Sequence, residues 1–159
     1  MLTIIQDTQE QIPFEFSDNV NVVIEKLPFG DYSLPGLELR VTIERKSLSD
    51  LVESITDARP RFARLLKALR RFDFAALVIE ADWSELENGE YRSKTQPRSV
   101  TGSILSFVID YRVEVILAGT HARGGEITER LLGFYAKRIE EAHKKLHKHQ
   151  KQAPATPGE

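Results

Sequence analysis

The sequence contains no cysteine, which excludes disulfide bonds and metal sites built from thiolates. It also lacks any uninterrupted apolar run near the ~20 residues that a membrane-spanning helix needs, so we expect no association with membranes. The first residues, MLTIIQDTQEQ, carry no basic side chain and reach an acid at Asp7, which argues against a secretory signal peptide. These absences are compatible with a globular protein of a reducing compartment.

Glycine-rich phosphate loops are missing as well. The stretches GLELRV and THARGGE fit neither the P-loop nor the dinucleotide-binding fingerprint, which removes the commonest nucleotide-binding interpretations. The net charge of −2 argues against a protein that simply coats nucleic acid, although basic residues on one face can still bind DNA. The 159 residues, 41% hydrophobic and 29% charged, are typical of one globular domain with a sizeable core.

Strand and helix patterns alternate through the second half of the chain, after a start rich in strands. Apolar and β-branched runs predict strands at 2–7, 20–27, 31–34, 38–46, 74–81 and 113–119. Helical spacing predicts helices at 48–56, 60–72, 100–111 (capped by Ser99) and about 126–147, and the polar segment 82–99 reads as a long loop with one short helical turn. We therefore expect an α/β domain at 1–148, with strands of mixed direction and helices on both faces, followed by a disordered tail at 149–159.

Three consecutive charges end the predicted strand 38–46. Because side chains alternate along a strand, Thr42, Glu44 and Lys46 share one face and Arg45 lies on the other. Asp31 reaches the same place if its short strand pairs with this one. Two carboxylates beside a lysine suit a hard divalent cation such as Mg²⁺, which can polarise a phosphoryl oxygen and lower the pKa of a bound water. The alternative is a solvated Glu–Lys pair, which the spacing alone favours.

The wider context resembles the XPF-type structure-specific endonuclease family. Its signature is Gly-Asp, a spacer, Glu-Arg-Lys, three residues and Asp, and the matching positions are Gly30, Asp31, Glu44, Arg45, Lys46 and Asp50. SITDARPRF is similar to the family's Ser-Ile-x-Asp-Gly-Arg segment, with Ala58 in place of glycine, and LVIEA is similar to its next buried strand. The resemblance covers roughly residues 2–138.

The resemblance implies a restriction-endonuclease-like fold, with a central mixed sheet of about six strands flanked by helices. It implies Mg²⁺-dependent cleavage of forks, flaps or duplex–single-strand junctions in DNA repair and recombination, with Mn²⁺ as a substitute metal. The implied metal ligands are Asp31, Glu44 and the main-chain carbonyl of Arg45; the implied catalytic set is Asp31, Glu44, Lys46, Arg45 and Asp50. It also implies a homodimer formed through the nuclease domain, and a location in the cytoplasm with the nucleoid or, in a eukaryote, in the nucleus.

Two departures from the family pattern stand out. The stretch from Asp7 to Glu10 reads Asp-Thr-Gln-Glu where the family has Asp-x-Arg-Glu, so the arginine is missing, and Asp7 and Glu10 stay as candidate ligands or water-positioning groups. The tandem helix-hairpin-helix module that family members often carry is not recognisable in this sequence. We therefore expect DNA affinity to come from the nuclease domain, a protein partner, or both.

Asp50 and Glu80 also have structural interpretations. Asp50, three residues after Ser47, fits a capping-box position that stabilises the following helix by roughly 1 kcal/mol. Glu80, at the end of a buried strand, is interpreted as a solvated strand end.

Basic residues are concentrated in two places, either of which is also explained by simple solvation. One face of the helix 60–72 and the residue before it carry Arg59, Arg61, Arg64, Lys67 and Arg71, opposite an apolar stripe, and this face is a candidate for phosphate contact. The polar loop near Tyr91 adds Arg92, Lys94 and Arg98. His143 and His147 are a weak metal signal, for which a basic, solvated helix end is the simpler explanation.

The last helix has more apolar surface than one stripe needs, from Leu131, Leu132, Phe134, Tyr135 and Ile139. A dimer is one explanation of this excess, and packing on the sheet is another.

Two rival functions stay open. One is a non-catalytic DNA-binding partner, although no acid or lysine of the motif is lost; the other is a general nuclease of the same fold, acting on linear DNA or RNA.

Overall fold

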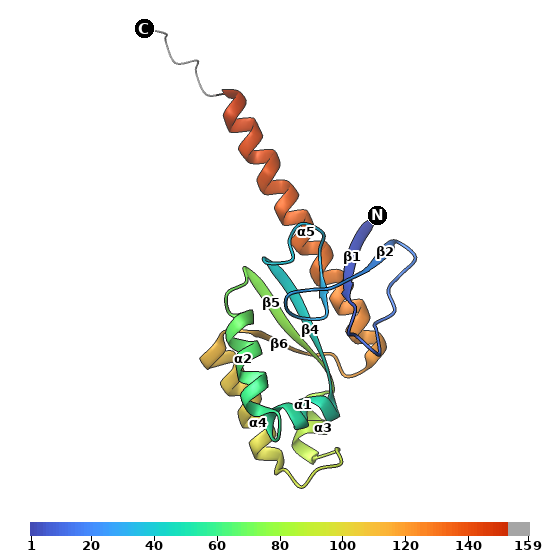
Figure 1. Ribbon diagram of the computed structural model, residues 1–159, viewed down its shortest axis with the longest axis vertical. Helices are drawn as coiled ribbons and strands as arrows, with labels where there is room; N and C mark the ends of the chain where they lie inside the picture. Colours follow the sequence, from blue (N-terminus) through green and yellow to red (C-terminus); the bar gives the residue numbers. More distant parts are fainter. Residues whose placement is uncertain (153–159) are drawn as a thin grey trace.

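The computed structural model describes residues 1–152, which form an α/β domain around one mixed six-stranded sheet (Figure 1). The strands lie in the order β2-β1-β3-β4-β5-β6. Their bounds are Leu2–Asp7 (β1), Val20–Glu25 (β2), Tyr32–Ser33 (β3), Val41–Ser47 (β4), Phe74–Glu80 (β5) and Glu114–Leu117 (β6). β4, β5 and β6 run parallel, β1 and β2 run parallel, and β3 is antiparallel to both β1 and β4. The predicted fold class is confirmed.

Helices cover both faces of the sheet. They are α1 (Leu48–Ile55), α2 (Arg59–Leu69), α3 (Trp83–Asn88), α4 (Pro97–Ser106), the π-helix η1 (Phe107–Tyr111) and α5 (His121–Gln152). Helices α1 to α4 and η1 pack on one face, against Leu77 and its neighbours in β5, and α5 packs on the other, where Leu132 meets Ile43 and Val78. β5 contributes to both cores, which explains its nearly continuous apolar sequence.

Several predicted boundaries differ from the structure, three of them in an informative way. The fourth strand begins at Val41 rather than residue 38, because Leu37 accepts main-chain hydrogen bonds from Arg40 and Val41 in a turn. The helix expected to be capped by Ser99 begins at Pro97 with Gln96 at its N-cap, so that cap prediction is wrong; proline suits the first helical position. The last helix is longer at both ends than 126–147, and residues 153–159 of the predicted tail lie outside the described residues.

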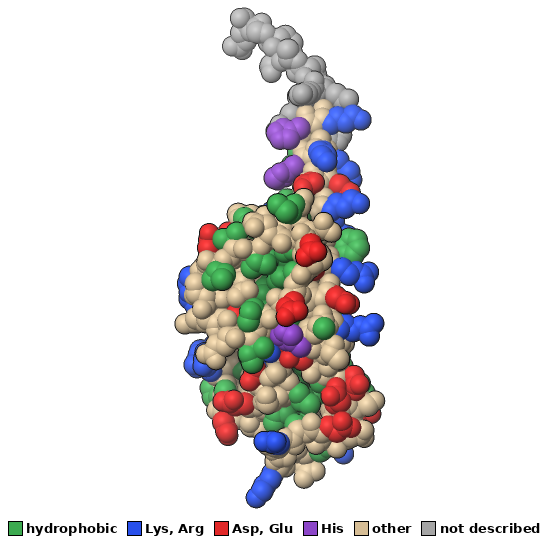
Figure 2. Space-filling model, turned by 90° about the vertical axis from the view of Figure 1, so that its right-hand side faces the viewer, with side chains coloured by type: hydrophobic (Ala, Val, Ile, Leu, Met, Phe, Trp, Pro, Cys, Tyr) green, Lys and Arg blue, Asp and Glu red, His purple; other side chains and the backbone are tan. Residues whose placement is uncertain are grey.

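Helix α5 extends well past the sheet (Figure 1), and its part from residue 137 to residue 148 carries mainly Lys, Arg, His and Glu side chains (Figure 2). All side chains from 141 to 148 are exposed. Within residues 1–152, no helix combines the length and the apolar character that crossing a bilayer requires.

Candidate active site

A tight turn brings Asp31 to the end of β4. Gly30 adopts a φ of 76°, and a Cβ on it would lie only 2.1 Å from the Thr42 hydroxyl, so the turn requires glycine. The Asp31 main-chain N–H donates to the Ile43 carbonyl at 2.8 Å, and β3 then pairs with β4 as predicted. The Asp31 carboxylate accepts from the Arg45 main-chain N–H at 2.7 Å. The Gly-Asp pair therefore anchors a carboxylate beside the charged end of β4.

Glu44 and Lys46 lie on the same face of β4, as strand alternation predicts. The Lys46 ammonium is 3.1 Å from a Glu44 carboxylate oxygen and 5.3 Å from the centre of the Phe62 ring. Asp31, Glu44 and Lys46 line one open cavity of about 470 Å³. This finding replaces the alternative of a solvated Glu–Lys pair, because Glu44 is buried and Lys46 is largely shielded from solvent.

Burial disfavours ionisation of both carboxyl groups, and the charge of Glu44 adds to this effect at Asp31. Burial, and next the charge of Glu44, raise the pKa of Asp31 to about 8. Burial also raises the pKa of Glu44, although Lys46 acts in the opposite direction. A bound divalent cation would relieve this repulsion, and carboxylate oxygens are the donors that Mg²⁺ prefers. The two carboxylates therefore fit the metal that the sequence resemblance implies.

The described residues contain no group of three or more His, Asp or Glu side chains arranged to hold a metal ion. Asp31 and Glu44 supply two carboxylates, and the implied role of the Arg45 carbonyl would add a main-chain ligand. That role, and those of Asp31 and Glu44 as ligands, stay predictions.

Asp7 also lines the cavity, but its carboxylate is already satisfied. One oxygen accepts from the Leu27 main-chain N–H at 2.7 Å, and the other accepts from the Gln9 N–H at 2.8 Å and lies 3.5 Å from Lys26. Burial alone would raise the pKa of Asp7, but these hydrogen bonds and the Lys26 charge together lower it. In the structure, Asp7 stabilises the turn after β1, and its role as a metal ligand stays a prediction.

Asp50 lies at the rim of the site, where it lines the cavity with Lys46. Helix α1 is capped by the Ser47 hydroxyl, which accepts from the Asp50 main-chain N–H at 3.2 Å. The cap therefore uses the backbone of Asp50 and leaves its carboxylate available to the cavity. A capping role does not explain why the side chain is an acid.

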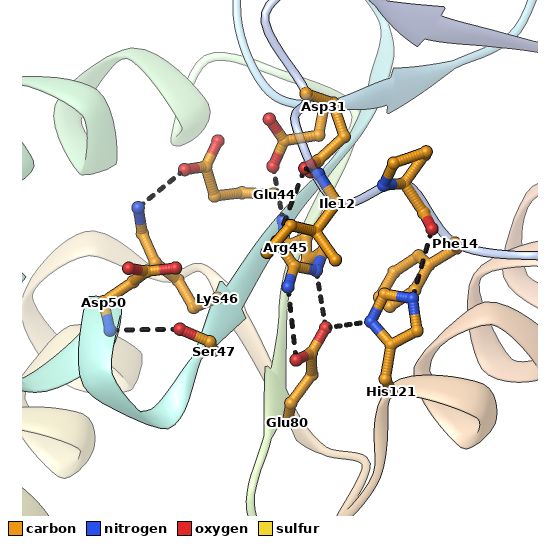
Figure 3. A network of polar contacts seen from close by, with 12 residues as sticks. Ile12, Phe14, Asp31, Glu44, Arg45, Lys46, Ser47, Asp50, Glu80 and His121 are labelled. Atoms are coloured by element: carbon orange, nitrogen blue, oxygen red, sulfur yellow. Dashed lines mark hydrogen bonds and ion pairs between the residues drawn. The ribbon is translucent and has the colours of Figure 1, made fainter.

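Arg45 points to the opposite face of β4, toward α5, as alternation predicts (Figure 3). Its guanidinium contacts Glu80 at 2.5 and 3.3 Å and Glu10 at 3.4 Å. Glu80 is in turn 2.7 Å from Nδ1 of His121. We call Glu10, Arg45, Glu80 and His121 the Arg45 network.

The interpretation of Glu80 as a solvated strand end is wrong, because only 12% of its side chain is exposed and it pairs with Arg45 and His121. Sequence reasoning missed His121 altogether. The pair of glycines that follows it was the available signal, because two glycines in the first turns of a helix indicate a close approach by another segment.

The predicted basic residues fall into two groups. Arg61 lines the cavity, and its charge is one of the influences that lower the pKa of Glu44. Arg59, Arg64, Lys67 and Arg71 are exposed on or beside the same helix, α2, whose Phe62, Leu66 and Leu69 are buried as predicted. Arg92, Lys94 and Arg98 are exposed between α3 and the first turn of α4 and do not line the cavity. Only the α2 group adjoins the site.

Comparison with known proteins places this architecture in a family. Residues 6–131 match the ERCC4 domain family. The chain is 26% identical over 113 residues to the "3'-flap repair endonuclease Xpf" of Saccharolobus solfataricus. It is 32% identical over 116 residues to the Methanocaldococcus jannaschii protein named "Putative ATP-dependent RNA helicase MJ1505". The matches cover 70% and 72% of this chain, but only 45% and 13% of the relatives.

Two solved structures share the fold. XPF from Aeropyrum pernix superposes with a TM-score of 0.66 at 20% identity, over 84% of this chain and 61% of that one. The same protein in complex with DNA gives a TM-score of 0.68 at 20% identity, over 87% and 66%. The family match covers most of the chain, and the fold match agrees with it. The chain therefore belongs to the ERCC4 domain family and has the fold of an XPF-type nuclease domain.

Proposed function

We propose that this domain is a metal-dependent endodeoxyribonuclease that hydrolyses phosphodiester bonds in branched DNA. The observation that carries the proposal is the pairing of Asp31 and Glu44 with Lys46 in one open cavity beside the exposed basic face of α2. The named activity of the Saccharolobus relative and the DNA-bound state of the Aeropyrum structure support the substrate class.

The residues of the site divide the chemistry between them. Asp31 and Glu44, with the Arg45 main-chain carbonyl, would hold Mg²⁺ or Mn²⁺. When bound, such a cation polarises a phosphoryl oxygen and favours loss of a proton from the attacking water. Glu44 holds the Lys46 ammonium at 3.1 Å, where it offsets negative charge that develops on the phosphate. Arg61, at the cavity wall, contacts the phosphate backbone and positions the substrate.

The main rival is a non-catalytic DNA-binding subunit. A subunit without activity has no need of Asp31, Glu44 and Lys46 in one cavity, and all three line it, with Lys46 3.1 Å from Glu44. This arrangement favours the enzyme. The second rival, a nuclease acting on linear DNA or RNA, uses the same groups and is separated only by experiment.

One experiment tests the function and its rivals. Purified protein is incubated with forked, flapped, linear duplex and single-stranded DNA and with RNA, each with Mg²⁺, Mn²⁺ or EDTA. We expect cleavage of the forked and flapped substrates with either metal and none in EDTA. Equal cleavage of linear duplex would indicate the general nuclease. Tight binding with no cleavage under any metal condition would indicate the non-catalytic subunit.

The exposed basic residues of α2, which we call the α2 face, should affect DNA affinity rather than the rate of cleavage. We expect Arg61→Ala with Arg64→Ala to weaken DNA affinity and to reduce the log–log salt slope by about 0.9 for each lost phosphate contact. The matched control, Arg130→Ala with Lys137→Ala on α5, removes the same charge from the other side of the sheet. Salt titrations of binding by fluorescence anisotropy measure both. Equal slopes in the two variants would assign the α2 face to solvent.

The variant Asp50→Asn should distinguish the role of Asp50 in the helix cap from a role of its carboxylate in cleavage. The cap uses the Asp50 main-chain N–H, so we expect little change in melting temperature, while loss of the carboxylate lowers cleavage about 10–100-fold. Ser47→Ala is the converse control: it removes the cap, costs about 1 kcal/mol of stability and leaves cleavage near normal. Near-normal cleavage by Asp50→Asn would leave this residue with no part in the reaction.

A homodimer is also proposed, through a surface other than the one that the sequence indicates. Leu132 is fully buried against the sheet and Leu131 and Tyr135 pack beside it, so α5 uses most of its apolar excess within the domain, although Phe134 is 60% exposed. Leu105, Val108 and Ile109, in contrast, are 54%, 47% and 74% exposed on α4 and η1. We expect Ile109→Glu to shift the protein from dimer to monomer in sedimentation velocity, without loss of fold. A wild-type monomer at micromolar concentration would exclude this dimer and leave DNA affinity to the domain or to another partner.

A further inference from the structure

The segment that follows β1 lies directly on the first turns of α5. A Cβ on Gly124 would lie 2.7 Å from the Phe14 ring, and a Cβ on Gly125 would lie 2.6 Å from the Glu15 carbonyl oxygen. Both distances are far below van der Waals contact, so the approach requires glycine at both positions. Phe14 is also held from the sheet side, where its main-chain N–H donates to the Tyr32 hydroxyl at 2.7 Å.

His121, the first residue of α5, contacts both the segment after β1 and the end of β5. Its Nδ1 is 2.7 Å from a Glu80 carboxylate oxygen and its Nε2 is 3.1 Å from the Pro13 carbonyl oxygen (Figure 3). Both partners are acceptors, so the ring makes both hydrogen bonds only when each nitrogen carries a proton. The imidazole thus joins the segment after β1 to the end of β5.

Glu80 connects His121 to the candidate active site, because it contacts both His121 and Arg45. It fixes the Arg45 guanidinium, which also contacts Glu10 of the same segment, and the Arg45 main-chain N–H donates to the Asp31 carboxylate. A continuous chain of contacts therefore runs from Pro13 through His121, Glu80 and Arg45 to Asp31. Three of the residues on it lie on β4, β5 and α5, and the other two, Pro13 and Asp31, lie in the segments after β1 and before β3.

We propose that His121 is a positioning residue: by joining Pro13 to Glu80 it fixes Arg45 and the 10–14 segment, and through the Arg45 main-chain N–H it sets the place of the Asp31 carboxylate. His121 itself does not line the cavity and acts only through these neighbours. The proposal deepens the nuclease function proposed above and rests on it for its kinetic consequence. Its structural part, the restraint on Arg45 and on the 10–14 segment, is independent of any activity.

The test compares His121→Ala with Arg123→Ala, an exposed position two residues along the same helix. Amide hydrogen exchange is measured first. We expect faster exchange in His121→Ala at the Arg45 amide and at the Phe14 amide, with exchange in β5 and in the far part of α5 unchanged, and we expect Arg123→Ala to match the wild type. Wild-type exchange at Arg45 and Phe14 in a folded His121→Ala protein would overturn the proposal.

Kinetics provide the second measurement. We expect His121→Ala to lower kcat about 10–100-fold with KM for DNA changed less than about twofold, and His121→Gln, which keeps one donor, to recover part of the loss. Gly124→Ala, which displaces Phe14 while His121 is intact, should lower kcat in the same way. An unchanged kcat in His121→Ala, or a loss confined to KM, would overturn the proposal. If the wild type cleaves no substrate, the proposed function fails, and the exchange data alone decide the restraint.

Discussion

Asp31→Asn is expected to lower DNA cleavage by about 10³-fold and, at the same time, to raise the melting temperature of the metal-free domain. The loss of activity follows because the variant lacks one of the two carboxylates of the site and the negative charge that attracts a cation. The gain in stability follows because the wild type buries two carboxyl groups that repel each other, and Asn removes one of the charges. Asn also keeps an oxygen that can accept from the Arg45 N–H.

The gain in melting temperature of Asp31→Asn over the wild type should increase as the pH rises. In the folded protein the pKa of Asp31 is about 8, above its ordinary value of 3.8. A group with a raised pKa contributes stability that is fully present below the ordinary value and is lost as the pH rises through the folded value. The advantage of Asp31→Asn is therefore small near pH 4, grows through pH 6 and is largest above pH 8.

Thermal unfolding in EDTA at pH 5, 7 and 9 measures this effect, with Asp18→Asn, an exposed acid, as the control. Addition of Mg²⁺ at pH 8 should then raise the melting temperature of the wild type and leave that of Asp31→Asn unchanged, because only the wild type has the complete site. A well-folded Asp31→Asn protein that cleaves at the wild-type rate would contradict the assignment of the site.

Arg45→Met is expected to cost about 3–5 kcal/mol of unfolding free energy, the largest effect on stability that we predict for a single substitution in this domain. Arg45, Glu80 and Glu10 have side chains only 7%, 12% and 6% exposed. Methionine fills part of the same volume but leaves both carboxylates without the guanidinium. Urea denaturation at pH 7 measures the loss.

The double variant Arg45→Met with Glu80→Gln is the matched control. It removes the charge on both sides of the closest pair, so part of the loss should be recovered although the protein then carries two substitutions. A loss below about 1 kcal/mol in Arg45→Met would mean that the Arg45 network is solvated and contributes as little as a surface ion pair.

The period of the strand explains why part of the site is predictable from sequence. Side chains alternate along β4, so the assignment of Glu44 and Lys46 to one face and Arg45 to the other requires no knowledge of the rest of the fold. The position of Asp31 follows from one further assumption, that its short strand pairs with β4. Both inferences are local and both are confirmed.

The partners of Arg45 are not predictable in the same way. Glu80 is 35 residues away in sequence, and His121 is 41 residues beyond Glu80; they meet because β5 ends and α5 begins at the same edge of the sheet. The sequence predicts the start of α5 at about residue 126, later than the observed His121, for a related reason. Glycine is unfavourable in a helix by about 1 kcal/mol, so Gly124 and Gly125 argue against helix there, whereas the structure uses them for close contact with Phe14 and Glu15.

Helix α5 also sets a length scale for the molecule. Its 32 residues span about 48 Å at about 1.5 Å per residue, and its first residue is the one that holds Glu80. A molecule bound to the far end of this helix would therefore lie about 48 Å from His121, which equals the length of roughly 14 base pairs of duplex at about 3.4 Å each. Such a molecule would contact none of the residues that line the cavity.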